Sequence, residues 1–373
     1  MRGPPDDPIS YDGRRVSVRS ISATGDQVGD LGIVVIGRNE GDRLRRCLDS
    51  LGTHAPPVVY VDSGSTDESV SLARSRSAEV VALDMSIPFT ASRARNAGVG
   101  RLREVAPDVA YVQFIDGDCE IMPGWLDQGR DVLKDRADVA IVAGALRERD
   151  PEASTYNRLA DVEWSVPAGE TDYCGGVAMA RMSAFTAVGG FDETVAAGEE
   201  LEMCGRLMRD GWKVLRVDAP MALHDMAMTR FGQWWRRQVR GGYGAYDVVA
   251  RFGDRSAFRG FRQQIRSSRA WALGWPAAVL VAALLGTWRG GPLSGACAAA
   301  LVALVLPAQA LRLAWKARRK LPDLRLALTH GCLTMLAKWA YLLGQLTHIA
   351  DAQRGRRARL IEHKDAGLAS GPT

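Results

Sequence analysis

Two uncharged stretches toward the C-terminal end restrict the fold of this chain more than any other feature. Residues 270–288 (AWALGWPAAVLVAALLGTW) are 19 consecutive uncharged residues, and residues 290–311 are another 22. A helix of about 20 residues is long enough to cross the hydrocarbon core of a bilayer. The alternative is a pair of helices buried in a soluble domain. We favour two transmembrane helices because the charges that flank these stretches are asymmetric.

The flanking charges predict the orientation of the two helices. Residues 312–325 contain six basic residues and one aspartate, whereas the short connection between the stretches contains only Arg289. Since basic loops stay on the cytoplasmic side, the first helix would leave the cytosol and the second would return. The large N-terminal part would then be cytosolic.

A third apolar run, residues 326–350, is interrupted by Lys338 and followed by the basic sequence RGRRAR. A full crossing would place that tail on the wrong side of the membrane. We therefore predict a helix that lies in the cytoplasmic interface or re-enters there. The membrane domain would span residues 270–350, and residues 351–373 would form a basic cytoplasmic tail.

Charge is distributed unevenly along the chain. Residues 1–229 contain 25 Lys/Arg and 37 Asp/Glu, so they carry −12, and the remainder carries +17. Residues 230–269 alone contain ten arginines, two aspartates and eight aromatic residues. Nucleic-acid binding also uses arginine and aromatic side chains. Just before a transmembrane helix, we favour instead an interfacial segment on anionic headgroups, with bounds 226–269 and no nucleic-acid partner.

The remaining sequence alternates between strand-like and helix-like segments. Residues 1–29 are polar and rich in Pro and Gly, and we predict a flexible N-terminus. The six cysteines contain no CxxC pair, which predicts reduced thiols and not a disulfide framework. Short apolar strands are predicted at 32–36, 58–61, 79–83, 109–115 and 139–143, separated by helices at 43–51, 69–76, 92–105 and 125–134. This alternation predicts an α/β domain over residues 30–225, with a mostly parallel sheet covered by helices on both faces.

Polar, carboxylate-bearing segments follow three of these strands: GRNEGD, DSGSTDES and DGDCE. Ligands of such sheets bind beyond the carboxyl ends of the strands. Ser65 and Glu68 fit a capping box that opens the second helix, and Asp62 is not needed for that cap. No GxxxxGK[ST] or GxGxxG motif occurs at the first turn, which argues against those phosphate-binding loops.

Two acidic clusters are candidates for chemistry. Asp116 and Asp118 flank a glycine and could hold Mg²⁺ or Mn²⁺, although acidic turns after strands are common. The second cluster, AGEELEMCGRLMRDGW (197–212), predicts a helix that ends at Gly211. Glu199 and Glu200 would lie in its first turn, where carboxylates also complement the helix dipole without any further role.

Taken in order, these motifs resemble the family 2 glycosyltransferases, which have the nucleotide-sugar-binding fold called GT-A. The resemblance covers about residues 31–225. It rests on the ordered set IVVIGRNE, VVYVDSGSTDES, ASRARNAG, FIDGDCE, CGGVAMARMSAFTAVGGFDE and GEELEMCGRLMRDGW. It implies a nucleotide-diphosphate sugar donor, with a UDP-sugar as the first expectation.

The resemblance implies roles for individual residues. Asn39 and Glu40 would line the nucleoside pocket, and Asp62 would bond the base or ribose. The remaining donor-side residues would be Arg95 and Asn96, which match a segment that shields the nucleotide, together with Gly175 and Gly176, which match a loop that frames the donor sugar and acceptor.

Metal and catalytic residues follow from the same resemblance. Asp116 and Asp118 match the DxD motif, with Asp118 the expected direct ligand of Mg²⁺ or Mn²⁺, and His224 matches a histidine that some members supply to the metal. The catalytic base, usually an aspartate, falls on Glu200. This departure leaves Glu199 or Glu202 as alternatives.

Processive members carry Gln-x-x-Arg-Trp after the base, and this chain has a degenerate version. Its residues could contact phosphate or acceptor: Gln233, Trp234, Trp235, Arg236 and Arg237. With two or three membrane segments, we predict single-sugar transfer to a lipid-linked acceptor, by an inverting, metal-dependent reaction in cell-surface polysaccharide or glycolipid synthesis. The expected location is a bacterial inner membrane with a cytosolic catalytic domain. Alternatives are a processive synthase, a nucleotidyltransferase and a non-catalytic membrane scaffold.

Overall fold

A computed structural model describes residues 28–52, 56–253, 258–321 and 323–355 of the chain. The expected flexible N-terminus and basic tail fall almost entirely outside these residues. Strands β1 to β9 are Leu31–Gly37, Val58–Asp62, Glu79–Ala82, Tyr111–Asp116, Cys119–Ile121, Val139–Glu148, Gly169–Glu170, Ala178–Arg181 and Lys213–His224. Helices α1 to α12 are Asp42–Ser50, Ser69–Ser75, Ala91–Val105, Trp125–Asp135, Thr155–Trp164, Met182–Ala187, Glu199–Arg209, Phe231–Phe252, Arg259–Arg269, Trp275–Ala303, Val305–Ala317 and Leu324–Gln353.

The strands form one mixed sheet, in the order β3-β2-β1-β4-β8-β6-β9-β5, with β7 paired to β9. The first four strands in this order are parallel, as predicted. Beyond β4 the sheet is mixed: β8 pairs antiparallel with both β4 and β6, whereas β6 and β9 pair parallel. Strands β5 and β7 also pair antiparallel with β9.

All five predicted strands and all four predicted helices of the N-terminal part are present. The last predicted strand is longer than expected, because β6 continues to Glu148. The predicted capping box is wrong: α2 begins after Glu68 without a side-chain cap. Ser65 instead accepts a hydrogen bond from the backbone N–H of Asn39, 26 positions earlier. The hydroxyl therefore joins two loops and does not open a helix.

Helix α3 covers the parallel strands through a close contact at Gly98. A Cβ atom at this position would lie 2.3 Å from Cγ1 of Val34 on β1 and 3.0 Å from Cγ2 of Val61 on β2. Both valines are fully buried. The absence of a side chain at Gly98 therefore allows α3 to lie close to the sheet. This matters for the site because α3 also carries Arg95.

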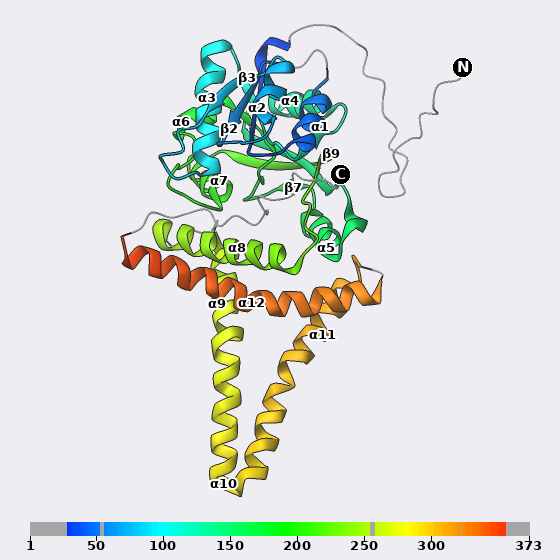
Figure 1. Ribbon diagram of the computed structural model, residues 1–373, viewed down its shortest axis with the longest axis vertical. Helices are drawn as coiled ribbons and strands as arrows, with labels where there is room; N and C mark the ends of the chain where they lie inside the picture. The colour runs from blue at the N-terminus through cyan, green and yellow to red at the C-terminus, as the bar shows by residue number, and fades with distance from the viewer. Residues whose placement is uncertain (1–27, 53–55, 254–257, 322, 356–373) are drawn as a thin grey trace, which may run out of the picture.

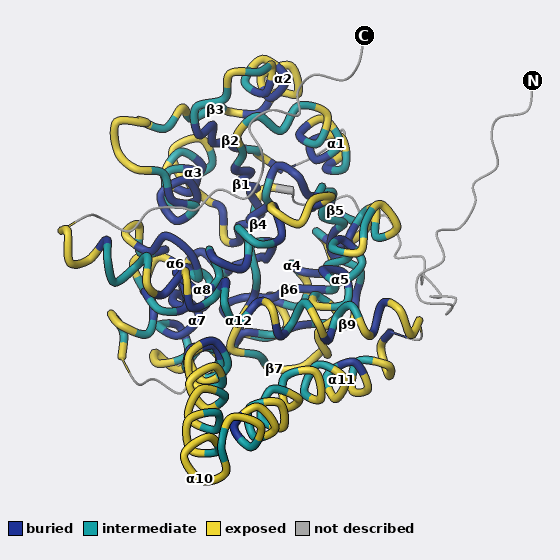
Figure 2. Tube along the Cα trace, turned by 60° about the horizontal axis from the view of Figure 1, so that its bottom comes forward, coloured by how far each residue is buried: buried dark blue, intermediate teal, exposed yellow. Residues whose placement is uncertain are grey.

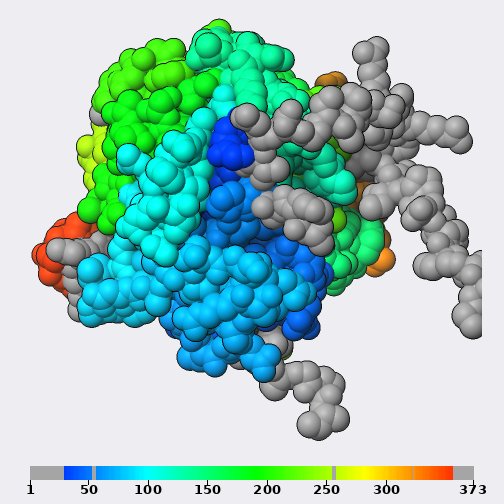
Figure 3. Space-filling model, turned by 90° about the horizontal axis from the view of Figure 1, so that it is seen from above, coloured from blue at the N-terminus to red at the C-terminus, as the bar shows by residue number. Residues whose placement is uncertain are grey.

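The C-terminal third forms a separate layer below the sheet. Helices α8 and α12 lie side by side, and α10 and α11 project away from them as a long hairpin (Figure 1). From the side opposite the hairpin, the molecule presents the sheet domain, coloured from blue through cyan to green (Figure 3). Helix α12 runs across the hairpin and not along it (Figure 1). This direction is compatible with the predicted interfacial placement, which stays a prediction.

The hairpin bends at Gly290 and Gly291, where the backbone of α10 is not helical. Its two limbs touch at Gly286 and Gly295, since a Cβ on Gly286 would lie 2.9 Å from the Cα of Gly295. Residues 259–317 form the one helical segment, within the described residues, that is long and apolar enough to cross a membrane, and its most apolar window is 0% buried. The hairpin is largely yellow in Figure 2, whereas the strands are dark blue. Two helices buried inside a soluble domain do not fit this exposure.

The contact at Gly98 predicts opposite effects for two glycines of the same helix. Gly98→Ala should lower stability by about 1–3 kcal/mol, because the added methyl overpacks the interface with the sheet. Gly100→Ala is the matched control: no atom lies within 4 Å of its Cβ position, so the higher helix propensity of alanine should raise stability by about 0.5–1 kcal/mol. Melting temperatures of both variants in detergent measure the difference. A shift in the same direction for both would contradict this packing.

Candidate active site

The loops after β1 and β2 hold each other at the carboxyl edge of the sheet. The backbone N–H of Asn39 donates to Ser65 Oγ (2.9 Å), and Asn39 Oδ1 accepts from the backbone N–H of Thr66 (2.7 Å). Asn39 has a positive φ of 52°, a conformation that asparagine tolerates better than most residues. Glu40 is ion-paired to Arg43 at 3.0 Å. The predicted nucleoside-pocket residues therefore form a fixed two-loop unit.

Asp62 ends β2 and is buried. Its Oδ2 accepts from the backbone N–H groups of Gly64 and Ser65, both at 3.0 Å. Tyr60 donates its hydroxyl hydrogen to Oδ1 at 3.4 Å. The sequence left Asp62 without a structural role, but its carboxylate shapes the turn that follows the strand.

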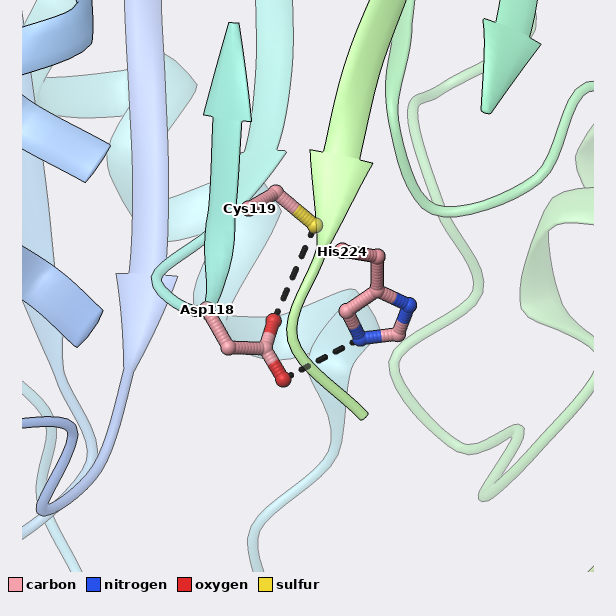
Figure 4. Close-up of side chains that lie close together, drawn as sticks. All are labelled: Asp118, Cys119 and His224. Atoms are coloured by element: carbon pink, nitrogen blue, oxygen red, sulfur yellow. Dashed lines mark hydrogen bonds and ion pairs between the residues drawn. The ribbon is translucent and has the colours of Figure 1, made fainter. Parts of the chain in front are cut away.

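Asp118, Cys119 and His224 form a group that could hold a metal ion, with ligand atoms within 4.8 Å of one another (Figure 4). His224 Nε2 lies 3.1 Å from Asp118 Oδ2, and Cys119 Sγ lies 3.7 Å from Asp118 Oδ1. Asp116 is not part of this group. The two aspartates of the DGD sequence thus face different partners.

Antiparallel pairing of β5 with β9 brings this group together, because Cys119 lies opposite His224 in the register. The backbone N–H of Asp225 donates to the carbonyl oxygen of Asp118 (2.9 Å) and fixes the end of β9. The ring of Trp164 stacks on the His224 ring, with centroids 4.8 Å apart. These contacts orient the imidazole toward Asp118.

Sequence reasoning missed three residues around this group: Cys119, Glu148 and Trp164. Cys119 lies inside the DGDCE sequence, so its position beside Asp118 was a usable signal. Glu148 ends β6 beside His224 in the register. Burial raises the pKa of Glu148 to about 7. The positions of Glu148 and Trp164 beside His224 depend on contacts between distant segments, for which the sequence has no local signal.

Arg95 is the centre of a second cluster. Its guanidinium, 3% exposed, lies 3.0 Å from Asp116 Oδ1 and 2.9 Å from Glu199 Oε1. Glu200 Oε1 is 3.7 Å away. The ring of Phe191 lies 5.4 Å from the guanidinium carbon. Arg95 thereby joins the end of β4 to the first turn of α7.

The three glutamates of α7 differ in what they contact. Both oxygens of Glu202 are bound by Arg206, one turn later on the same helix, and Glu199 is paired with Arg95. Glu200 makes a looser contact, 3.7 Å from Arg95, and its side chain is 14% exposed. Burial raises the pKa of Glu200 to about 7, with the charge of Glu199 adding to the rise and Arg95 opposing it. Of the three glutamates of α7, Glu200 is therefore the one best suited to accept a proton near neutral pH.

Gly176 lies against the same cluster. A Cβ at this position would be 2.8 Å from Asp116 Oδ2 and 3.4 Å from Glu200 Oε1, so only glycine leaves both carboxylates in place. Its neighbour Gly175 has φ +82°, in the left-handed region. The predicted donor-sugar loop therefore packs directly on the predicted base.

Asn96 contacts the chain itself. Its side-chain amide donates to the carbonyl oxygen of Phe191 (2.8 Å), and its Oδ1 accepts from the backbone N–H of the same residue (3.0 Å). Asn96 thus holds the loop that begins at Gly189. This loop carries Phe191 to the guanidinium of Arg95.

The residues of the degenerate processive motif lie at the start of α8. Gln233 is buried and accepts from the backbone N–H groups of Thr229 and Arg230, both at 2.9 Å. Buried Trp234 stacks with Tyr156, with centroids 6.2 Å apart. The other three are half-buried: Trp235, Arg236 and Arg237, of which the last pairs with Glu163 at 3.0 Å.

Comparison with known proteins agrees with this architecture. The mannosyltransferase PcManGT from Pyrobaculum calidifontis, solved in complex with GDP-Man and Mn²⁺, superposes with a TM-score of 0.53 at 18% identity. The match covers 86% of this chain and 87% of that one. At this identity the likeness establishes the fold alone, which is the predicted GT-A fold.

Two curated relatives come from Mycobacterium tuberculosis. A pre-mycofactocin glycosyltransferase is 28% identical over 244 residues, 61% of this chain. The chain spans about half of that relative, since the match covers 49% of its length. An N-acetylglucosaminyl-diphospho-decaprenol L-rhamnosyltransferase is 28% identical over 238 residues, 53% of this chain and 76% of the relative.

Family profiles cover both the sheet domain and the segments below it. Residues 32–188 match the profile described as glycosyl transferase family 2, and residues 162–315 match the one described as glycosyl transferase family group 2. The resemblance read from the ordered motifs is thereby confirmed. The chain belongs to the family 2 glycosyltransferases.

Proposed function

We propose that this chain transfers a single sugar from a nucleotide-diphosphate donor, with a UDP-sugar as the first candidate, to a lipid-linked acceptor. One observation carries the proposal. Glu200, whose pKa is raised to about 7, lies beside Gly176, Arg95 and Asp116 at the carboxyl edge of the sheet. A base next to a donor-binding edge is the minimum that one displacement at the sugar carbon requires.

In this proposal Glu200 accepts the proton of the acceptor hydroxyl as that oxygen attacks C1 of the donor sugar. The bond from C1 to the diphosphate breaks in the same displacement, so the configuration at C1 inverts. Arg95 holds the carboxylate beside the reacting centre, and Gly176 leaves space for the sugar. No covalent intermediate is needed.

The ligand atoms of the group formed by Asp118, Cys119 and His224 fit a divalent cation. A buried carboxylate and an imidazole, Asp118 and His224, converge on one point, and both suit Mn²⁺. The thiol of Cys119 is a softer ligand that suits this ion less well. Bound there, the cation would neutralise charge on the departing diphosphate. PcManGT, which shares the fold, was solved with Mn²⁺.

The acceptor is proposed from the C-terminal layer and one relative. The apolar hairpin below the sheet fits two transmembrane helices, which would hold the site at the cytosolic face of a bacterial inner membrane. The mycobacterial rhamnosyltransferase is named for an acceptor of the diphospho-decaprenol class. Because Gln233 and Trp234 are buried in contacts within the chain, we favour single transfer over processive synthesis.

A direct test supplies purified protein in detergent with a panel of nucleotide sugars, Mn²⁺ and polyprenyl-diphosphate sugars. The proposal expects release of a nucleoside diphosphate together with a labelled, extractable lipid. Release of pyrophosphate would instead indicate a nucleotidyltransferase. Absence of both products with every donor, from protein that shows donor-dependent thermal shifts, would indicate a non-catalytic role.

Glu200→Gln should lower the turnover number by about 10²–10⁴-fold, because the amide cannot accept a proton. Donor affinity should stay near that of the native protein, since the amide keeps the shape of the side chain. Glu104→Gln, an exposed change near the C-terminal end of α3, is the control. Near-native turnover of Glu200→Gln with intact donor binding would remove Glu200 from the base position.

The raised pKa of Glu200 also predicts the pH dependence of transfer. The carboxyl is protonated below pH 7 and cannot act as a base there, so the rate should fall about tenfold per pH unit below about 6 and level off above about 8. The profile of turnover against pH measures this limb. In Glu200→Gln the limb should vanish from the residual rate; its persistence would assign it to another group.

Asp118→Asn and His224→Ala should each weaken Mn²⁺ binding by at least roughly tenfold, the loss that removal of outer-shell partners already causes at metal sites. Cys119→Ser is the matched control and should leave the Mn²⁺ affinity near its native value, because this ion favours oxygen and nitrogen ligands. Titration followed by electron paramagnetic resonance measures the affinity without requiring activity. A loss in Cys119→Ser equal to that in Asp118→Asn would make the thiol a ligand and point to a softer metal.

A further inference from the structure

Helix α9, Arg259–Arg269, presents a row of arginines on one face. Arg259, Arg262 and Arg266 follow each other at helical spacing, and α9 itself contains no acidic residue. Together with Gln263, Ser267 and Ala270 they line an open groove of about 590 Å³. Arg259 and Arg266 are exposed, and Arg262 is half-buried. We refer to these three residues as the arginine face of α9.

The arginine face lies immediately above the first apolar limb of the hairpin. Helix α9 continues through the π-helical turn Ala270–Gly274 into α10 as one helical segment. At a rise of about 1.5 Å per residue, Arg266 lies about 6 Å and Arg259 about 16 Å from the start of the uncharged stretch. Arginine side chains can extend several ångströms further toward phosphates. If the hairpin crosses a bilayer, as the proposed function assumes, the arginine face is at the level of the lipid headgroups.

The opposite face of α9 contacts residues of α7 and α8. Phe258 is fully buried in a cluster with Val248 and Leu201, and Phe261 packs against the same cluster. A Cβ on Gly198 would lie 3.2 Å from Cε2 of Phe261. Gly198 has φ +86° and is the residue from which α7 begins, directly before Glu199. One helix therefore touches both the headgroup level and the start of the helix that carries the proposed base.

We infer that the arginine face binds the phosphate of an anionic phospholipid headgroup, and that this binding steadies the first turn of α7. Charge complementarity carries the first part, because three guanidinium groups form a favourable site for a phosphate diester. The contact between Phe261 and Gly198 carries the second part. The inferred site lies outside the donor site and differs from the acceptor of the proposed reaction.

The test uses the full chain in neutral detergent, titrated with phosphatidylglycerol and, separately, with phosphatidylcholine. Arg262→Gln combined with Arg266→Gln should weaken phosphatidylglycerol binding by roughly 25-fold, about fivefold for each arginine. Arg74→Gln combined with Arg103→Gln removes the same charge from exposed positions on α2 and α3 and should leave the affinity unchanged. Phosphatidylcholine should not bind at comparable concentrations.

Several outcomes would overturn the inference. Equal losses in both double variants would reduce the effect to net charge. An equal affinity for inorganic phosphate would assign the groove to a free anion, and preferential binding of a single-stranded oligonucleotide would assign it to nucleic acid. None of these measurements requires sugar transfer, so they stand even if the proposed reaction is wrong.

The contact with α7 has its own readout. Phosphatidylglycerol should slow hydrogen exchange of the backbone amides of residues 200–203 in the native chain but not in the arginine double variant. The Phe261→Ala variant should lose this protection but keep the lipid affinity. The retained affinity would also show that the variant is folded. Unchanged exchange in the lipid-saturated native chain would leave the lipid site without a connection to α7.

Discussion

The guanidinium of Arg95 is the interaction on which the rest of the candidate site depends. It lies between Asp116 at the end of β4 and Glu199 at the start of α7, two carboxylates from distant parts of the chain. Without the guanidinium between them, these carboxylates and Glu200 would repel one another. Only the pair with Glu199 is buried on both sides, and breaking a buried pair by removing one partner typically costs about 3–5 kcal/mol. Because Arg95 is buried on α3, the close packing of Gly98 on the sheet determines where the guanidinium lies.

Helix α7, which Arg95 holds through Glu199, also connects the sheet to the layer of helices below it. Just before α7, the carbonyl oxygen of Ala197 would lie 2.6 Å from a Cβ on Gly244 of α8, so the two backbones nearly touch. Helix α8 in turn packs along α12, and a Cβ on Gly344 would lie 2.1 Å from the carbonyl oxygen of Val239. Two contacts that admit only glycine therefore fix the height of the carboxylates above the hairpin. A site that acts on a lipid-linked acceptor needs such a fixed height.

Much of the fold could be predicted because its signals are local. Strands β1, β2 and β4 are short, almost continuously buried segments, and the carboxylates that follow them necessarily meet at one edge. Strands β8 and β9 were not predicted, because β8 is only four residues long and β9 mixes charged with apolar residues. Their pairing decides the second half of the sheet and brings His224 to Asp118 across 106 positions. Ser65 failed as a cap for the same reason: a distant backbone group competed for its hydroxyl.

The aspartates of FIDGDCE illustrate how pairing between distant segments assigns chemistry that a motif leaves open. The two carboxylates are two positions apart on a tight turn, and both could bind a cation by residue type alone. Asp116 is in register with Ile36 on β1 and faces α3, where Arg95 engages its carboxylate. Asp118 lies directly before β5, whose antiparallel partner is β9, so its carboxylate meets the imidazole of His224. A carboxylate already paired with a guanidinium is a weaker metal ligand than one beside an imidazole. Asp118 is therefore the aspartate best placed to touch a cation, and Asp116 the one that ties the donor edge to the proposed base.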